Sequence, residues 1–474
     1  MNISFLNIKS EDKSIWDTVD PQNYGVLLLS QILRDEGHKV SIHNNKTIKG
    51  KLEKIARESD AVCFSFFTSG ANTAYKVSKN IRELSPGKPI IMGGIHPSNF
   101  PKEALNYSDF VIRKEGEIAL PRLINTLERG LDDFSDILNL SYKSGGRIKN
   151  NPSAEMIEDK SILQISPARD LDPNKKTLNR IPVLTCGRGC PYNCNFCSNI
   201  FGRKMRLNDP EWVVEEVQKI IKNNYSGLGN VIFFGSDNFA ANRQWAKDVL
   251  TLSIKKNLAG KICYHVQTRT DIARDQELLD LMKPFVTRDY IGVESFDDEV
   301  LKDLDKGISA EKMKEQLLTI INNGIPVHTH LICGTNYDTA EKIHKTVETA
   351  KDIGAYAISL FTLTPFPGTK LRWKMHNEDR IITNNWDNYN LHHVTVAPLI
   401  DRPSNIQRAV VDGYKNFYSL NGVYKNLKKM PNPVALLYGL SLWNAFRKYN
   451  LNSHIEFLKN WEEKRYDRNN ELIK

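Results

Sequence analysis

A regular alternation of short β-rich runs with helical segments constrains the fold of this chain more than any other feature. In residues 1–130, amphipathic stretches such as Tyr24–Gly37 and Ala71–Leu84 separate the β-rich runs. Those runs are Ile3–Ile8, Lys39–His43, Ala61–Phe66, Pro89–Gly93 and Phe110–Arg113. Strands that alternate with helices pair in parallel, so residues 1–135 are expected to form a doubly wound sheet. Such sheets bind ligands at the carboxyl ends of their strands.

A second alternation of the same kind spans residues 181–370. Its strand candidates are Pro182–Thr185, Asn230–Phe234, Ile262–Gln267, Tyr290–Gly292, Val327–Ile332 and Ala357–Thr362. Successive βα units of this kind predict a six-stranded partial barrel, with chemistry on the loops that follow the strands.

The segments between and after these stretches have a different character. Residues 136–180 are expected to be a linker, with one hairpin at the turn Ser144–Arg147. Residues 371–474 show no convincing β pattern, which predicts a helical C-terminal cap. Aromatic residues recur there at helix-compatible positions and are expected to form its core in preference to a binding site. They are Trp386, Tyr389, Tyr414, Phe417, Tyr418, Trp443 and Phe446.

Composition is that of an ordinary globular protein, with 40% hydrophobic and 26% charged residues among 474. The sequence shows no apolar run long enough to span a membrane and no signal peptide, so a cytoplasmic location is expected. The net charge of +9 reflects solvated helix faces or an attraction to an anionic substrate or membrane surface. Basic residues gather near the C-terminus at Lys425, Lys428, Lys429, Arg447 and Lys448.

Four of the seven cysteines lie within residues 186–197, directly after the first predicted barrel strand. Cys190, Cys194 and Cys197 have the spacing C-x3-C-x2-C. Thiolates are the natural ligands of iron–sulfur clusters, and three of them leave one iron of a 4Fe–4S cluster open. Cys186 is expected to pack at the strand end. As a fourth thiolate it would instead complete a closed zinc site, which is the alternative.

The remaining cysteines, Cys63, Cys263 and Cys333, lie inside apolar strand-like segments and are expected to be small core residues.

This cysteine loop after the first barrel strand resembles the radical SAM superfamily, with the aromatic Phe196 before the last cysteine. The resemblance implies that the open iron binds S-adenosylmethionine through its amino and carboxylate groups. One electron, from an external donor such as flavodoxin or ferredoxin, then cleaves it to methionine and a 5′-deoxyadenosyl radical. Phe196 is counted among the expected cofactor-binding residues.

The loop after the second barrel strand contains Gly235, Ser236 and Asp237. These residues match the superfamily positions that contact the methionyl amino group, where a turn and a carboxylate accept hydrogen bonds from an ammonium group. A helix N-cap at Ser236 or Asp237 is an alternative that does not exclude this role.

The ends of the third and fourth barrel strands carry Gln267 and Arg269, and Glu294 and Ser295. Both resemble positions that hold the ribose hydroxyls and the methionyl carboxylate. Arg269 suits a carboxylate and Glu294 suits a ribose diol. The alternative is a salt bridge between Arg269 and Glu294 across neighbouring strand ends.

The loop Thr364–Thr369 and the N-terminal sheet resemble one subgroup, the cobalamin-binding radical SAM enzymes. Its signatures are similar to Met92–Pro97, with Gly93, Gly94 and His96, and to Arg113–Glu117, with Glu115 and Gly116. The glycine pair lets the backbone approach a flat ligand closely.

Ser65 and Thr68, after the third strand, are further candidates for binding cobalamin. The Asp-x-His-x-x-Gly motif is missing, so His96 is counted among cofactor-binding residues but is not assigned to cobalt. A domain that keeps this fold without cobalamin is the alternative.

The resemblance implies cobalamin-dependent methylation of an unactivated carbon in a small-molecule or lipid substrate. Ring formation or rearrangement with the same cofactors is the first alternative, and no residue is assigned to catalysis. Radical SAM methylthiotransferases, which modify RNA, need three cysteines in the N-terminal domain, whereas residues 1–135 of this chain contain Cys63 as their single cysteine. No nucleic acid is therefore expected as a partner, and association with a membrane stays open. A non-catalytic zinc scaffold or corrinoid carrier is the remaining alternative.

Overall fold

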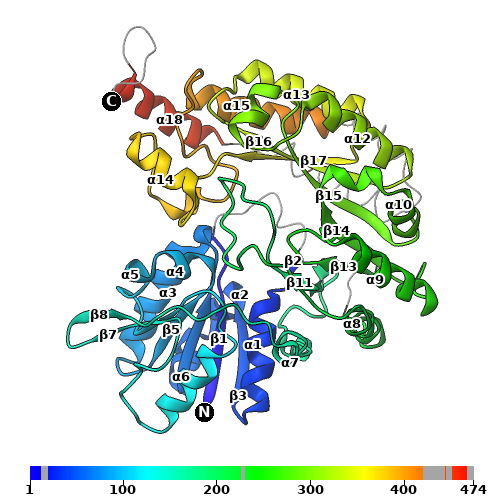
Figure 1. The fold of residues 1–474 in the computed structure, drawn as a ribbon. Helices are drawn as coiled ribbons and strands as arrows, with labels where there is room; N and C mark the ends of the chain where they lie inside the picture. Colours follow the sequence, from blue (N-terminus) through cyan, green and yellow to red (C-terminus); the bar gives the residue numbers. More distant parts are fainter. Residues whose placement is uncertain (12–19, 226–229, 420–443, 445–450, 467–474) are drawn as a thin grey trace.

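The computed structural model describes residues 1–11, 20–225, 230–419, 444 and 451–466. It contains two large sheets, each flanked by helices, and a helical C-terminal segment beside the second sheet (Figure 1). The α/β fold class expected from the two alternations is confirmed.

The first sheet has the strand order β3-β1-β4-β5-β6-β7-β8, and its first five strands are parallel. These strands are β1 (Asn2–Asn7), β3 (Lys39–Asn44), β4 (Ala61–Ser65), β5 (Ile90–Gly93) and β6 (Phe110–Ile112). The connecting helices are α1 (Tyr24–Asp35), α2 (Asn45–Glu58), η2 (Thr68–Gly70), α3 (Ala71–Leu84), α4 (Ile95–Asn99), α5 (Pro101–Ala104) and α6 (Ala119–Glu128). β1 begins at the end of the domain remote from the barrel, so the carboxyl ends of the parallel strands face the barrel (Figure 1).

The expected hairpin is present, and it lengthens the first sheet. β7 (Leu140–Ser144) pairs antiparallel with β6, and β8 (Arg147–Asn150) pairs with β7. Gly145 and Gly146 form the tight turn with φ values of 57° and 74°. Consecutive positive φ values are what a two-residue hairpin turn requires. The first sheet therefore continues beyond residue 135 into the segment that was expected to be a linker.

The second sheet has the order β10-β13-β14-β15-β16-β17, and every pair is parallel. Its strands are β10 (Val183–Leu184), β13 (Val231–Phe234), β14 (Cys263–Thr268), β15 (Val286–Glu294), β16 (Val327–Cys333) and β17 (Ala357–Thr362). The helices are α8 (Pro210–Lys222), α9 (Arg243–Lys255), η4 (Thr270–Arg274), α10 (Gln276–Met282), α11 (Asp298–Asp303), α12 (Ala310–Asn322) and α13 (Ala340–Asp352). All six predicted barrel strands are found, in chain order.

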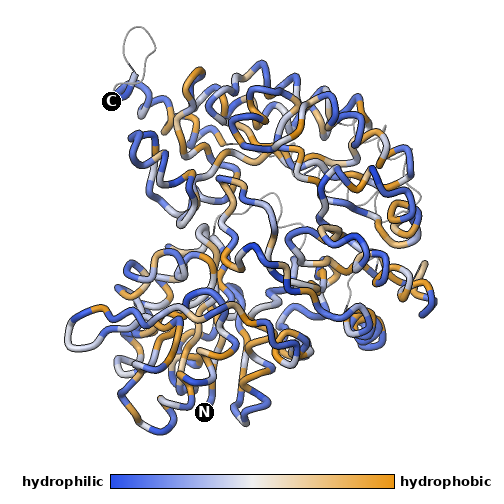
Figure 2. The backbone as a smooth tube through the Cα atoms, in the orientation of Figure 1, coloured by the Kyte–Doolittle hydropathy of each residue, from blue (hydrophilic) through white to orange (hydrophobic). Residues whose placement is uncertain are grey.

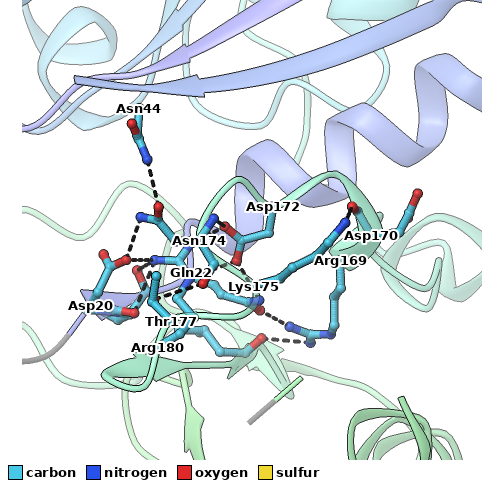
Figure 3. Close-up of polar contacts among 12 residues, drawn as sticks. Asp20, Gln22, Asn44, Arg169, Asp170, Asp172, Asn174, Lys175, Thr177 and Arg180 are labelled. Atoms are coloured by element: carbon cyan, nitrogen blue, oxygen red, sulfur yellow. Dashed lines mark hydrogen bonds and ion pairs between the residues drawn. The ribbon is translucent and has the colours of Figure 1, made fainter. Parts of the chain in front are cut away.

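A polar network ties the segment before the barrel to the first domain (Figure 3). This segment contains α7 (Lys160–Leu163), η3 (Arg169–Leu171) and β9 (Arg180–Ile181), which pairs with β2 (Asp20–Pro21). The buried Arg180 guanidinium donates two 2.7 Å hydrogen bonds to Asp172, and Gln22 donates another of 2.8 Å to the same carboxylate. Arg169 binds Gln22 and the Val183 carbonyl of β10.

The hydrophobic positions lie on the strands and on the helix faces that cover them (Figure 2). The C-terminal segment comprises α14 (Lys370–Asn377), η5 (Trp386–Asn388), α15 (Pro403–Phe417) and α18 (Asn452–Arg465). Tyr414, Phe417 and Tyr418 join the barrel core, as expected. Trp386 and Tyr389 instead join a core cluster of the first domain.

Two other expectations fall on residues that the structure does not describe. They concern the aromatic residues Trp443 and Phe446 and the basic residues Lys425, Lys428, Lys429, Arg447 and Lys448. Within the described part of the chain, no helix is both long and apolar enough to cross a membrane.

Candidate cofactor sites

The three cysteines Cys190, Cys194 and Cys197 lie on one loop between the short strands β11 (Gly187–Arg188) and β12 (Arg206–Leu207). The loop closes on itself, because the Cys190 amide donates to the Gly202 carbonyl at 3.1 Å. Gly189, just before Cys190, has a φ of 88°, and a β-carbon there would collide with the Lys204 carbonyl. The position therefore requires glycine.

The surroundings of this loop favour the protonated form of two of its thiols. Burial raises the pKa of the Cys190 thiol, and it raises that of Cys197 to about 11, with Asp237 and the neighbouring cysteines adding to both shifts. Arg269 opposes the shift at Cys190. The Cys190 and Cys197 thiols therefore keep their protons unless a cation replaces them, as iron does in a cluster.

The described residues contain no group of three His, Cys, Asp or Glu side chains placed to hold a single metal ion. A 4Fe–4S cluster binds each thiolate through a different iron, so its ligands do not converge on one point.

Cys186 is part of the hydrophobic core of the barrel. Its side chain is fully buried, and burial raises its pKa well above the ordinary value. Its thiol faces the Leu184 carbonyl at 3.6 Å. The expected packing role is confirmed, and the geometry argues against Cys186 as the fourth ligand of a zinc site.

Several residues expected to bind S-adenosylmethionine follow β13 or lie at the end of β14. Asp237 accepts a 3.3 Å hydrogen bond from Asn199 of that loop. Gln267 donates to the Ser236 carbonyl at 3.3 Å, which joins the ends of the two strands. A β-carbon on Gly235 would lie 2.8 Å from the Val183 side chain.

The helix after β13 tests the alternative role of Ser236 and Asp237. Asn242 caps α9, because its side chain accepts a hydrogen bond from the Trp245 amide. The alternative of an N-cap at Ser236 or Asp237 is therefore wrong. Phe196, within the cysteine loop, packs against an apolar cluster that contains Leu304 and Leu371.

Arg269 and Glu294 do not form the salt bridge that was the alternative to ligand binding. The Arg269 guanidinium stacks on the Tyr192 ring, 4.0 Å from its centroid. Glu294 forms a buried ion pair with Lys306 at 2.9 Å and has a φ of 67°. Sequence reasoning missed both partners, although Tyr192 lies inside the cysteine motif. Contact of Arg269 and Glu294 with S-adenosylmethionine stays a prediction.

Ser295, after Glu294, is buried, and its hydroxyl accepts a 3.1 Å hydrogen bond from the Asp297 amide. This contact places its hydroxyl at the start of α11, because Asp297 is the N-cap of that helix. A ligand contact for Ser295 stays a prediction too.

A cavity of about 60 Å³ lies at the carboxyl ends of β1, β4, β5 and β6. Four residues expected to bind cobalamin line it, namely Ser65, Gly93, Gly94 and Gly116. Gly94 has a φ of 101°, and a β-carbon there would lie 2.7 Å from the Phe66 carbonyl. Apolar side chains such as Leu29 and glycine backbone line this cavity, so a ligand there would meet apolar surface and bare backbone.

His96 and Thr68 do not line this cavity. His96 is completely buried, with Nε2 at 3.1 Å from the Tyr75 hydroxyl and its ring packed edge-on against Trp386. Thr68 is buried in η2, which contacts η5. The structure thus places both residues in the contact between the first domain and the C-terminal segment. The prediction that they bind cobalamin is not supported.

Glu115 is also placed differently from the expectation. Both of its carboxylate oxygens accept hydrogen bonds from the protein, at 2.6 Å from Arg188, 2.7 Å from Arg206 and 2.8 Å from the Ile157 amide. Arg188 also binds Glu117 at 2.5 Å. Burial opposes ionisation of Glu115, but the arginines and the amide together hold its pKa below the ordinary value.

Glu115 therefore joins the first domain to the barrel instead of facing the cavity. Few residues separate this contact from the cavity lining on one side and from the cysteine motif on the other. Gly116, which lines the cavity, lies between Glu115 and Glu117, and Arg188 precedes Cys190 by two residues.

Comparison with known protein families supports both candidate sites. Residues 184–350 match the model of the radical SAM superfamily, and residues 18–124 match that of the B12 binding domain. The first match contains the cysteine loop and four of the six barrel strands in full, β13 to β16, while the second contains the cavity-lining glycines.

Curated relatives match the chain over most of its length. An uncharacterized methyltransferase of Pyrococcus horikoshii is 27% identical over 86% of this chain and 90% of its own length. An anaerobic magnesium-protoporphyrin IX monomethyl ester cyclase of Rubrivivax gelatinosus is 25% identical, over 88% and 74%. A hopanoid C-3 methylase of Methylococcus capsulatus is 24% identical, over 80% and 73%.

Solved structures share the fold. The cobalamin-dependent S-adenosylmethionine radical enzyme OxsB superimposes with a TM-score of 0.71 at 18% identity, over 94% of this chain and 71% of its own. The radical S-adenosylmethionine methyltransferase TsrM from Kitasatospora setae gives a TM-score of 0.65 at 15% identity, over 98% and 99%. The expected cofactors, a 4Fe–4S cluster, S-adenosylmethionine and cobalamin, are those of the two matched families. The chain belongs to the radical SAM superfamily and places a B12-binding domain ahead of its radical SAM domain.

Proposed function

We propose that the protein is a cobalamin-dependent radical SAM enzyme that transfers a methyl group to an unactivated carbon. One observation carries the proposal. The buried contact between Arg188 and Glu115 joins the cysteine loop to the turn that lines the glycine cavity. This contact fixes the position of the proposed cluster site relative to the proposed cobalamin site.

The chain's own residues position the cofactors, which supply the radical and methyl-transfer chemistry. Cys190, Cys194 and Cys197 would hold the cluster and leave one iron for S-adenosylmethionine. Arg269, fixed by its stacking on Tyr192, is suited to the methionyl carboxylate. Glu294, oriented by Lys306, is suited to the ribose hydroxyls.

Gly93, Gly94, Gly116 and Ser65 would receive cobalamin at the end of the first sheet that faces the barrel (Figure 1). The names of the relatives from Pyrococcus and Methylococcus favour methylation. The match to the magnesium-protoporphyrin cyclase supports a second candidate, ring formation with the same cofactors.

The substrate is a small molecule, and the reducing electron comes from an external donor. Within these classes we propose a small molecule or a lipid as substrate and a donor such as flavodoxin or ferredoxin. Neither proposal depends on a particular residue.

The test is anaerobic incubation of the purified protein with cobalamin, a reductant, S-adenosylmethionine carrying a deuterated methyl group, and cell extract. Mass spectrometry then follows 5′-deoxyadenosine and labelled products. A product with a deuterated methyl group supports methylation. Formation of 5′-deoxyadenosine without transfer of the label selects ring formation or rearrangement.

Two cysteine variants complete this test. Cys194→Ala removes a cluster ligand and should abolish formation of 5′-deoxyadenosine. Cys263→Ala is the matched control, because Cys263 lies on β14 outside the loop and should leave iron and sulfide content unchanged. Unimpaired formation of 5′-deoxyadenosine by Cys194→Ala would contradict the cluster assignment.

A further inference from the structure

A second cavity, of about 400 Å³, lies between the cysteine loop and α14, the helix drawn in yellow in Figure 1. Asn195 of the cysteine motif is part of its lining. The apolar part of the lining consists of Leu304, Leu363, Leu371 and Met375. These four residues belong to the apolar cluster against which Phe196 packs. The cavity therefore shares a wall with the loop that carries the three cysteines.

This wall is joined to the cysteine motif by a backbone hydrogen bond. The Leu371 amide donates to the Asn195 carbonyl at 3.0 Å. Asn195 directly follows Cys194, and its side-chain amide donates to the Asp303 carbonyl at 3.3 Å. One hydrogen bond and one peptide link thus separate the cavity wall from a residue expected to hold the cluster. An electron passes more readily along bonds than across an empty gap, so this wall offers a short route to the cluster.

The rim of the cavity is aromatic and basic. Trp373 lines it, and the side chain of this residue is 72% exposed. Lys370 and Lys374 line it too, and both are exposed. Among the described residues neither lysine pairs with a carboxylate, whereas the acidic residue of the lining, Asp303, accepts a 2.9 Å hydrogen bond from the Asn336 side chain. An apolar centre with tryptophan and charge at its edge is typical of a surface that binds another protein.

The partner that fits this surface is a small acidic protein that carries single electrons. The proposed reaction takes one electron from an external donor, and this surface lies beside the loop that would receive it. Its two lysines favour an acidic partner through charge complementarity. Its apolar wall favours a flavin over an iron–sulfur group, because a flavin can present the flat, methyl-bearing edge of its ring. Flavodoxin combines the acidic surface with the flavin.

We propose that Trp373, Lys370 and Lys374, with the apolar wall beneath them, are the docking surface for reduced flavodoxin. In the docked pair the donor's flavin is oxidised by one electron and the cluster is reduced by one. No atom or proton passes between the two proteins. This assignment rests on the proposed function, because it requires a cluster at Cys190, Cys194 and Cys197.

The main test separates electron delivery by a protein from delivery by a small reductant. Lys370→Glu combined with Lys374→Glu reverses both charges of the rim. Formation of 5′-deoxyadenosine is measured with reduced flavodoxin and, separately, with dithionite. Because opposite charges steer association, kcat/KM for flavodoxin should fall about tenfold at low salt, while the rate with dithionite stays within about twofold of wild type. Added salt should shrink the difference.

The matched control is Lys312→Glu combined with Lys345→Glu. It makes the same change of charge at exposed positions of α12 and α13, which do not line the cavity. This control should match the wild type with both reductants. Equal losses with the two reductants in the rim variant, or no loss with either, would overturn the proposal. So would a wild-type protein that accepts electrons from dithionite but not from reduced flavodoxin.

A binding measurement tests the surface without turnover. Titration calorimetry follows oxidised flavodoxin added to the cluster-loaded protein in the absence of S-adenosylmethionine. Trp373→Ala removes the exposed ring and should raise the Kd about tenfold, as tryptophans at the centre of interfaces do. Leu178→Ala is the control, because Leu178 is 69% exposed and lies outside the cavity lining. Equal Kd values for wild type and Trp373→Ala would overturn the proposal.

Other occupants of this surface give different results, and each would overturn the proposal. A basic helix with an exposed tryptophan can also lie on an anionic membrane. In that case the rim variant would lose binding to phosphatidylglycerol vesicles and keep its rate with flavodoxin. A ferredoxin site would show the tenfold loss with reduced ferredoxin alone. A raised KM for S-adenosylmethionine with dithionite as reductant would assign the cavity to that ligand.

The outcomes of these tests and of the labelling experiment are independent. Formation of 5′-deoxyadenosine without label transfer, with the flavodoxin results as expected, would overturn methylation and leave the docking surface in place. Label transfer with wild-type flavodoxin kinetics in the rim variant would overturn the docking surface and leave the proposed function standing.

Discussion

Two of the contacts that join the B12-binding domain to the rest of the chain differ in kind. The polar junction consists of Glu115, Glu117, Arg188 and Arg206, all buried. The aromatic junction consists of His96, Phe100 and Trp386, with Glu103 accepting a 2.8 Å hydrogen bond from the indole of Trp386. The first leads directly to the cysteine loop, whereas the second anchors the segment after the barrel.

The difference lies in what each junction can specify. Hydrogen bonds between guanidinium and carboxylate groups are directional, so the polar junction sets an orientation as well as a distance. Aromatic packing stabilises mainly through the area it removes from water and tolerates small rotations. We therefore expect the polar junction to determine where the cluster lies relative to cobalamin. The aromatic junction adds stability.

The largest effect is expected from Arg188→Met. This change removes the charge that balances Glu115 and Glu117 and leaves buried carboxylates behind, which costs about 3–5 kcal/mol. Denaturant unfolding should show this loss, and iron and sulfide content should fall because β11 leads into the cysteine loop. Arg34→Met is the control, since the Arg34–Asp170 pair is exposed and should contribute less than about 1 kcal/mol. Equal losses in the two variants would contradict the special role of the polar junction.

A smaller effect is expected from Trp386→Phe at the aromatic junction. The change keeps a ring but loses part of the packing and the hydrogen bond to Glu103, which should cost about 1–2 kcal/mol. Iron content should not change. Trp373→Phe is the control, because Trp373 is 72% exposed and should unfold like the wild type. A loss of iron in Trp386→Phe would show that the aromatic junction also positions the cluster.

Gly368→Ala should disturb the aromatic junction from its barrel side. We expect it to lower the free energy of unfolding by about 1 kcal/mol. Gly368 has a φ of 79°, and a β-carbon there would collide with the side chain of Asn99 in the first domain. Thermal unfolding should show a midpoint lowered by a few degrees. Gly260→Ala is the control for the strained φ alone, because its φ is 75° and the space around it is open. A smaller loss in Gly368→Ala than in Gly260→Ala would rule out the contact with Asn99 as a constraint.

Mild acid should produce the smallest effect, because both junctions contain a carboxylate with a lowered pKa. Burial opposes ionisation of Glu115 and Glu103, but their partners outweigh it. A lowered pKa contributes stability that is present above the unfolded value of about 4.5 and is lost as the pH falls through the folded value. Stability should therefore hold down to about pH 5 and then decline.

The two carboxylates can be separated by substitution. Glu115→Gln should flatten the acid decline more than Glu103→Gln, because arginine hydrogen bonds hold the Glu115 carboxylate. Denaturant midpoints between pH 3 and 7 give both curves. The opposite ranking would assign the greater electrostatic contribution to the aromatic junction.

The sequence alone determined the features that depend on local patterns. The alternation of strands and helices, the cysteine spacing and the turn at Gly145 and Gly146 each involve residues that are near neighbours in the chain. Periodicity and backbone preference act over such distances, so these features could be predicted. Family resemblance then connected the cysteine loop with S-adenosylmethionine and the first domain with cobalamin.

Only the tertiary structure decided how the parts meet. Glu115 and Arg188, or His96 and Trp386, lie far apart in the sequence, and no local pattern pairs them. The same holds for Glu294, whose partner is Lys306, and for Asn195, whose carbonyl meets the Leu371 amide. Charge and hydrophobicity are properties of single residues, but the partner that satisfies a buried charge depends on the path of the whole chain.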